Sequence, residues 1–178
     1  MEQALVDLRQ NLLEWAQGEP NPGVRIFVYP PECEARMLAR FPSFTEELAP
    51  QVPLCLVDVG QGFLEEVERR KGMIGRLEVQ EQQSTDRLLR DLGEIAHRYL
   101  TKLLATPVTS LAFGRLLINS GALGTYVSYS AITNALHGDA GASGVASPAV
   151  LAFPGEGDER ELSLLRLRAD TNYRVPRI

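Results

Sequence analysis

The strongest structural signal in this chain of 178 residues is the run Pro148-Ala149-Val150-Leu151-Ala152-Phe153-Pro154-Gly155. Its five consecutive apolar residues, closed by Pro-Gly, are typical of a buried strand that leaves the sheet at a surface turn. Residues 24–29, 54–59 and 116–119 are mainly apolar and predict three further strands, and a start of the last one as early as Leu111 is open. Fully apolar strands favour a parallel sheet that is covered on both faces.

The N-terminal segment predicts an amphipathic helix over residues 1–18. Leu5, Leu8, Leu12 and Trp15 recur every three or four residues and therefore form one apolar stripe. Such a stripe usually packs against its own domain, but it also fits a groove on a partner. Both alternatives are open, and the second makes Leu8, Leu12 and Trp15 candidate partner-binding residues.

The other connecting segments are also mostly helical in pattern. Residues 32–48 predict two short helices, because Pro42 lacks a backbone donor and biases Phe41 away from helical geometry. Residues 60–104 form the helical centre of the chain. Residues 138–147 are rich in glycine and predict a flexible loop.

The alternation of strands with helices predicts the fold class. We expect a single α/β domain over residues 1–178, with three layers and a mainly parallel sheet of about four to five strands flanked by helices. The arrangement is Rossmann-like but lacks a Walker A loop, since no Gly-Lys-Ser or Gly-Lys-Thr follows a glycine turn.

Composition narrows the function classes. Hydrophobic residues make up 44% of the chain and charged residues 23%, and the net charge of −5 disfavours direct DNA binding. No apolar run reaches the ~18 residues that span a bilayer, and Glu2, Asp7 and Arg9 interrupt any signal-peptide core. We therefore expect a cytoplasmic protein without membrane contact. The two cysteines and two histidines lack ligand-like spacing, which predicts no metal and no cofactor.

The segment Ser120-Gly121-Ala122-Leu123-Gly124 is a candidate ligand loop. A strand that feeds a glycine turn and a helix directs backbone amides at an anion. Asp58 ends another strand, and ligands of parallel sheets approach the carboxyl ends of strands, so Asp58, Gly121 and Pro154-Gly155 are expected to converge. The alternatives are that the glycines serve a structural turn and that Asp58 caps the next helix.

No group of residues has the spacing of a catalytic site. The chain lacks a Gly-x-Ser-x-Gly elbow, and its paired carboxylates accompany arginines or lie on expected helix surfaces. We therefore expect a protein without enzymatic activity.

Three blocks of sequence resemble the BrxB family of BREX phage-defence systems. These blocks are residues 25–34, residues 54–58 with the helix through Val67, and residues 149–155 with the terminal Asn172-Tyr173-Arg174. Gly121 and Gly124 are placed as in the family. The chain differs after that turn, where residues 127–131 lack the family's proline and arginine, and at Phe153, where the family has tyrosine. The likeness is to a divergent member.

The resemblance implies a non-enzymatic accessory or assembly protein. Proteins of this family are encoded beside a PglZ-type alkaline-phosphatase-like protein, a methyltransferase and a large ATPase, and we expect docking onto the PglZ-type protein and contact with other BREX components.

Tyr173 and Arg174 are the second set of candidate partner-binding residues, because such residue types dominate interface hot spots. Packing of Tyr173 on its own domain is equally open. The alternative function is a nucleotide- or anion-binding α/β protein that uses Gly121–Gly124 beside Asp58.

Overall fold

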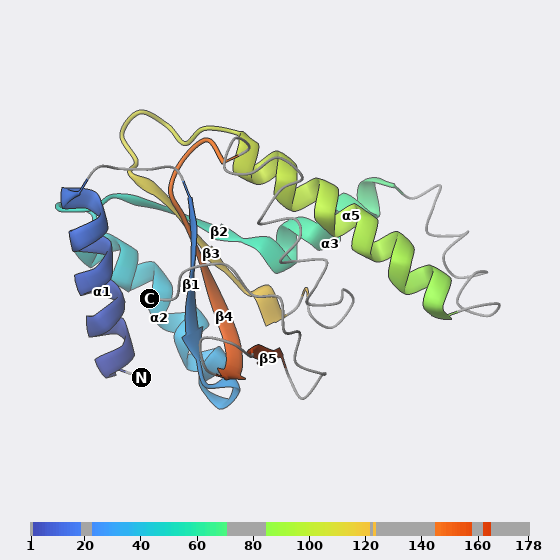
Figure 1. The fold of residues 1–178 in the computed structure, drawn as a ribbon, viewed down its shortest axis with the longest axis horizontal. Coiled ribbons are helices and arrows are strands. Elements are labelled where there is room, and N and C mark those ends of the chain that lie inside the picture. The colour runs from blue at the N-terminus through green and yellow to red at the C-terminus, as the bar shows by residue number, and fades with distance from the viewer. Residues whose placement is uncertain are drawn as a thin grey trace.

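The computed structural model describes residues 2–18, 23–70, 85–121, 123, 145–157 and 162–164 (Figure 1). Four strands form an all-parallel sheet in the order β1-β4-β3-β2. They are β1 (Val24–Tyr29), β2 (Leu54–Asp58), β3 (Gly114–Ile118) and β4 (Ala149–Gly157). Helices cover both faces, which confirms the predicted α/β fold class.

The strand that the sequence marks most strongly, β4, lies inside the sheet. It pairs with β1 from Val24↔Ala149 to Tyr29↔Pro154, and with β3 from Arg115↔Ala149 to Leu117↔Leu151. Residues 149–155 are all buried. The strands β1 and β2 form the two edges, and β2 is only half-buried up to its exposed end at Asp58.

One face of the sheet is covered by α1 (Glu2–Gln17) and α2 (Glu34–Leu48). A short 3₁₀ turn, η1 (Pro31–Cys33), joins β1 to α2. The predicted stripe of α1 forms and packs inward: Leu8 and Leu12 are fully buried, and Trp15 is 7% exposed. The Trp15 ring meets Phe113 edge-on at 5.8 Å, and the Arg25 guanidinium lies 4.1 Å from its centroid. This stripe therefore belongs to the protein's own core.

The opposite face is covered by α3 (Val59–Arg69) and α5 (Thr85–Ala105), as Figure 1 shows. Phe63, Ile95 and Leu100 from these helices pack with Leu117 and Leu151 of the sheet. The chain crosses from β1 to β2 over one face and returns from β2 to β3 over the other. Right-handed crossovers that run in opposite directions require this division of the helices.

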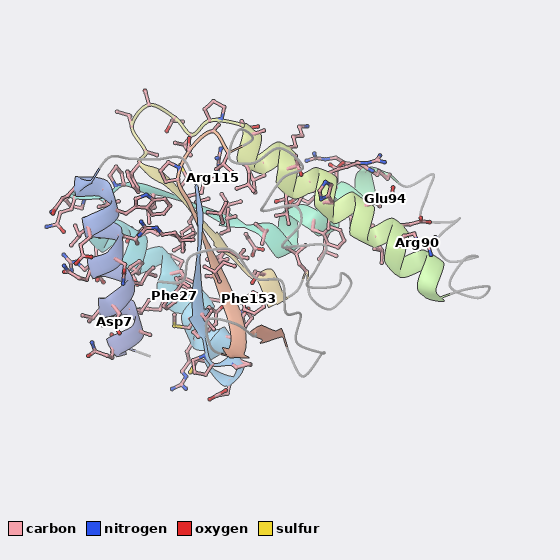
Figure 2. All side chains as sticks on the ribbon, in the orientation of Figure 1. Asp7, Phe27, Arg90, Glu94, Arg115 and Phe153 are labelled. Atoms are coloured by element: carbon pink, nitrogen blue, oxygen red, sulfur yellow. The ribbon has the colours of Figure 1, made fainter. Side chains whose placement is uncertain are left out.

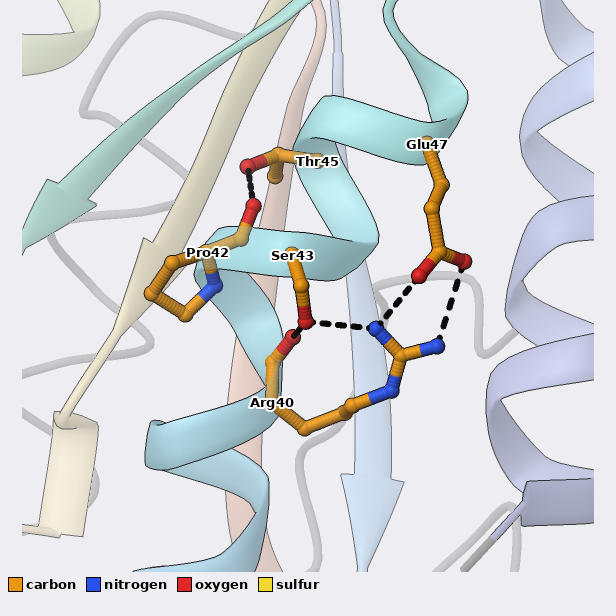
Figure 3. Close-up of polar contacts among 5 residues, drawn as sticks. All are labelled: Arg40, Pro42, Ser43, Thr45 and Glu47. Atoms are coloured by element: carbon orange, nitrogen blue, oxygen red, sulfur yellow. Dashed lines mark hydrogen bonds and ion pairs between the residues drawn. The ribbon is translucent and has the colours of Figure 1, made fainter.

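Helix α2 is continuous through Pro42, so the prediction of two short helices is wrong. Pro42 is exposed, and the Thr45 hydroxyl donates to its carbonyl at 2.8 Å (Figure 3). Arg40 spans the same turns, with Nη1 2.8 Å and Nη2 3.1 Å from the two carboxylate oxygens of Glu47. A buried stripe on both sides of the proline holds the helix on the sheet. It consists of Met37, Phe41, Phe44, Thr45 and Leu48.

The strand β4 also differs from expectation, since it does not end at Pro154-Gly155. Pro154 is the last residue paired with β1, and the strand then continues to Gly157 as the antiparallel partner of β5 (Leu162–Leu164). A proline cannot donate to the sheet, so it ends one ladder. The chain then pairs with a different strand instead of turning away.

Within the predicted flexible loop over residues 138–147, residues 138–144 lie outside the described part. Ala146 and Ser147 are anchored, because the Ala146 amide donates to the Leu104 carbonyl at 2.9 Å and the Val108 amide donates to Ser147 Oγ at 3.2 Å. In the part of the chain that the structure describes, none of the helices is long and apolar enough to cross a membrane.

Candidate functional site

The carboxyl edge of the sheet brings together several residues that the sequence predicted to converge. Asp58 ends β2, and its Oδ1 accepts a hydrogen bond from the Gln61 amide at 2.8 Å. This confirms the predicted role of Asp58 as the cap of the following helix. The same oxygen accepts from Asn119 Nδ2 at 2.9 Å, so Asp58 also ties the end of β2 to the end of β3.

The turn after β3 reaches the neighbouring strand β4. Asn119 has a φ of 61°, a left-handed conformation that asparagine tolerates better than most residues. The fully buried Ser120 then donates from Oγ to the Ala152 carbonyl at 2.7 Å. A Cβ on the buried Gly121 would lie 3.0 Å from Pro154 Cγ and 3.4 Å from Glu34 Oε1. The turn thus fits closely against β4 and the start of α2.

The structure therefore places Asp58, Gly121 and Pro154 along one edge, as predicted. Gly124 lies outside the described residues. Glu34 and Tyr29 belong to the same edge, and sequence reasoning gave them no role of their own. No spacing pattern marks them, because they meet only once β1 and α2 are in place.

Tyr29 and Glu34 form a hydrogen-bonded pair at this edge, and the pKa of each lies above its ordinary value. The Tyr29 hydroxyl donates to Glu34 Oε2. Burial raises the pKa of Glu34 above its ordinary value, although the hydrogen bond from Tyr29 acts in the opposite direction. Burial, together with the hydrogen bond to Glu34, raises the pKa of Tyr29. The edge thus presents a half-buried carboxyl group beside a glycine turn.

A second candidate, the basic pocket, lies between α3, α5 and the start of β3. We use this name for the cavity of about 460 Å³ that Gly62, Tyr99, Leu103 and Thr106 line together with seven charged residues. The charged residues are the basic Arg69, Arg70, Arg98, Lys102 and Arg115 and the acidic Glu65 and Glu66. Basic groups thus outnumber acidic ones in its wall.

Ion pairs occupy most of the arginines around the basic pocket. Arg70 Nη2 lies 2.7 Å from Glu66 Oε1, and hydrogen bonding by Arg70 lowers the pKa of Glu66. Arg69 lies 3.7 Å from carboxylate oxygens of both Glu65 and Glu66. Arg98 lies 3.3 Å from Glu94, which is not part of the pocket wall.

Arg115 has a different environment, because only 6% of it is exposed. Its Nη2 donates to the Thr106 carbonyl at 2.5 Å, whereas the buried Nη1 has no hydrogen-bond partner among the described residues. Figure 2 labels Arg115 near the end of α5 that meets the sheet, and Glu94 farther out along that helix. Sequence reasoning missed this residue. The available signal was a charged residue inside the apolar strand 114–118.

The predicted partner-binding residues fall into two groups. Leu8, Leu12 and Trp15 are buried against the sheet and α2, so a partner cannot reach them while the domain is folded. This corrects the prediction that they form a docking surface and confirms the alternative of packing within the domain. Tyr173 and Arg174 lie outside the described residues.

Comparisons with known proteins add no relative. A scan against protein-family models, a search of curated proteins and a search of solved structures each found no match. The resemblance to the BrxB family is therefore a hypothesis drawn from the sequence blocks described above. In the fold, these blocks provide β1 with the turn after it, β2 with α3, and the buried part of β4.

Proposed function

We propose that the protein is a non-enzymatic accessory or assembly protein of a BREX bacteriophage-resistance system, and that it acts in the cytoplasm by docking onto the PglZ-type partner. The observation that carries this proposal is the order of the three blocks that resemble the BrxB family, over residues 25–34, 54–67 and 149–155. Their order and spacing along the chain are more specific than any one block.

The polar side chains Asp58, Glu34 and Ser120 at the carboxyl edge make hydrogen bonds within the domain, which supports a role without catalysis. Asp58 is engaged by the Gln61 amide and by Asn119, Glu34 is engaged by Tyr29, and Ser120 donates to the backbone of β4. Each of these side chains thus joins two parts of the domain. Residues of the resembling blocks therefore serve as a scaffold that holds the strands and helices together.

Because the apolar stripe of α1 is buried, the candidate docking surface on this helix is its outer face. Val6 is the exposed apolar residue there, with 58% of its surface accessible, and polar residues such as Asp7 and Gln10 surround it. The tail residues Tyr173 and Arg174 are the other candidates, as the sequence suggests. We propose that the PglZ-type protein contacts one of these two surfaces.

Co-expression with the PglZ-type protein and affinity purification test this proposal. We expect the full chain to recover the partner, and either Val6→Asp or the pair Tyr173→Ala and Arg174→Ala to reduce recovery, since truncating an important interface residue costs more than about 1 kcal/mol, roughly fivefold in affinity. Leu111→Asp is the matched control, because Leu111 is 86% exposed on the α5–β3 connection.

Leu8→Asp is not a suitable variant, because Leu8 is fully buried and we expect a charge there to destabilise the domain strongly. Failure of the unmodified chain to recover the PglZ-type protein would exclude docking. Equal recovery by all the variants would exclude both surfaces.

The alternative function, nucleotide or anion binding at Gly121–Gly124 beside Asp58, receives less support. Glu34 and Asp58 both face this edge and are acidic, and Asp58 already uses its Oδ1 to cap α3. A phosphate placed here would meet like charge. Calorimetric titration of the Gly121→Ala variant against the unmodified chain with adenosine triphosphate separates this edge from any other nucleotide site.

A further inference from the structure

We infer that the basic pocket between α3, α5 and the start of β3 binds a small ligand that carries a phosphate group, with Arg115 and Lys102 as the groups that contact the phosphate. This inference goes beyond the docking proposal and does not depend on it. The volume of about 460 Å³ lies within the range of small-molecule sites and is large enough for a mononucleotide.

The charges that remain after pairing favour an anion. Arg69 and Arg70 are paired with the two acidic residues of the wall, and Arg98 is paired with Glu94. Lys102 and Arg115 form no ion pair within the described ranges, although the charge of Lys102 contributes to the lowered pKa of Glu66, and five basic residues face two acidic ones in the pocket wall. A phosphate monoester carries one to two negative charges at neutral pH, which Lys102 and Arg115 match.

Arg115 gives the pocket a buried donor that lacks an acceptor. Its Nη1 is desolvated but bonds to none of the described residues, and an unmade hydrogen bond of a buried charged group is costly. A guanidinium binds phosphate through two adjacent N–H groups. Because Nη1 has almost no exposed surface, a phosphate oxygen reaches it only when the groups around it move; it would then satisfy this donor, while Nη2 stays on the Thr106 carbonyl.

Tyr99 of α5 supplies a neutral donor to the pocket wall. Burial, and then the charges of Asp58, Glu65 and Glu66, raise the pKa of its hydroxyl, so the group stays protonated at neutral pH. Its position depends on Gly62, because a Cβ there would lie 2.0 Å from the hydroxyl oxygen. The glycine thus gives Tyr99 room to lie against α3 within the pocket wall.

The shape and charge of the site favour a compact ligand over a nucleic-acid backbone. Arg115 is almost fully buried, so a contact with it requires a group that enters the cavity. The exposed Glu65 at the wall and the net charge of −5 oppose an extended polyanion that lies across the surface.

Calorimetric titration of the full chain at low ionic strength tests the inference. The probes are inorganic phosphate, adenosine monophosphate and adenosine, with a short polyglutamate peptide as a competing acidic ligand. We expect saturable 1:1 binding of adenosine monophosphate, weaker binding of phosphate and no heat from adenosine. Binding of phosphate comparable to that of the nucleotide would identify a free-phosphate site of the same chemistry.

The Lys102→Gln variant should weaken binding of adenosine monophosphate by about tenfold or more, as expected for the loss of a charged hydrogen bond. Arg9→Gln is the control, because it removes the same charge from the exposed surface of α1 on the other face of the sheet. Arg115→Lys retains the charge but not the two adjacent donors, and should also weaken binding; a thermal melt checks that this variant is folded.

Three results would overturn the inference. One is the lack of heat with both phosphate and adenosine monophosphate. The second is an equal loss of affinity in Lys102→Gln and Arg9→Gln, which would show general charge attraction. The third is binding of the polyglutamate peptide alone, which would identify a surface for acidic protein segments.

Discussion

At the residue scale, single polar side chains at strand ends hold the domain together. Asp58 is the clearest case, because one carboxylate oxygen accepts from the Gln61 amide in α3 and from Asn119 after β3. The capping role was predictable from sequence, since aspartate at a strand–helix junction commonly caps the helix. The bond to Asn119 was not, because it depends on which strand lies beside β2.

Replacing Asp58 should destabilise the fold, and the loss should be larger when the new side chain has no acceptor oxygen. We expect Asp58→Ala to lower the free energy of unfolding by about 1–2 kcal/mol, because it removes the helix cap and the bond to Asn119. Asp58→Asn retains an acceptor oxygen and should lose much less. Urea denaturation followed by circular dichroism measures both. An equal loss in the two variants would contradict the capping role.

Glu34 should make stability depend on pH. Burial raises its folded-state pKa above the ordinary value of 4.5, so the folded protein holds this proton more tightly than the unfolded chain. Its contribution to stability is fully present below pH 4.5 and is lost as the pH rises through the folded pKa. Glu34→Gln stays neutral, and we expect its stability relative to the unmodified protein to increase as the pH rises from about 4 to about 8.

Glu47→Gln is the control for this measurement, because the sign is opposite there. Hydrogen bonding by Arg40 lowers the pKa of Glu47, so its contribution is present above the ordinary pKa and is lost as the pH falls through the folded value. The stability deficit of Glu47→Gln should therefore shrink on acidification. Parallel pH profiles for Glu34→Gln and the unmodified chain would show that Glu34 titrates normally.

At the element scale, close pairing of the strands places limits on side-chain size. Gly114 begins β3, and a Cβ there would lie 2.4 Å from the Pro148 carbonyl oxygen, which is a backbone atom and cannot rotate away. This carbonyl also accepts from the Arg115 amide at 2.9 Å. The approach of β3 to the start of β4 therefore requires glycine at this position.

Gly114→Ala should separate the two strands at this end. We expect the free energy of unfolding to fall by about 1–3 kcal/mol or more, as is typical of forced overpacking. Gly18→Ala serves as the matched control, since its added Cβ meets only ordinary contacts at 3.5 and 3.8 Å. Thermal and urea unfolding report both variants. Equal stability of the two would show that β3 and β4 can move apart without cost.

Elements were predictable from sequence where one local rule applied, and less so where packing overrode it. The apolar runs at residues 24–29 and 54–58 are strands because branched residues suit a pleated, covered surface. Pro42 misled the prediction, because the local cost of proline was outweighed by the buried stripe that extends on both sides of it. Likewise, the continuation of β4 past Pro154 depends on β5, a partner that no local pattern reveals.

At the whole-molecule scale, the sheet separates the outer face of α1 from the basic pocket. The outer face of α1 with Val6 lies on one side, and the basic pocket between α3 and α5 lies on the other (Figure 1). The pocket escaped prediction because its residues come from two helices and a strand. On each helix alone, their alternating charges resemble an ordinary solvated face.

This separation predicts that the two activities are independent. Val6→Asp should leave the affinity for adenosine monophosphate unchanged, and Lys102→Gln should leave recovery of the PglZ-type protein unchanged. Affinity purification and calorimetry on both variants provide the measurement. A loss of ligand binding in Val6→Asp, or of partner recovery in Lys102→Gln, would show that the two faces are coupled or that the surfaces are wrongly assigned.

The position of β4 between β1 and β3 has a consequence for protein synthesis. β1 pairs only with β4 within the described sheet, from Val24↔Ala149 onward, so it has no strand partner until the chain has been made past Ala149. Contacts this distant in sequence form slowly, and unpaired strand edges promote aggregation. We therefore expect a nascent chain that stalls before Ala149 to leave β1 without a neighbouring strand and to be prone to aggregation until translation resumes.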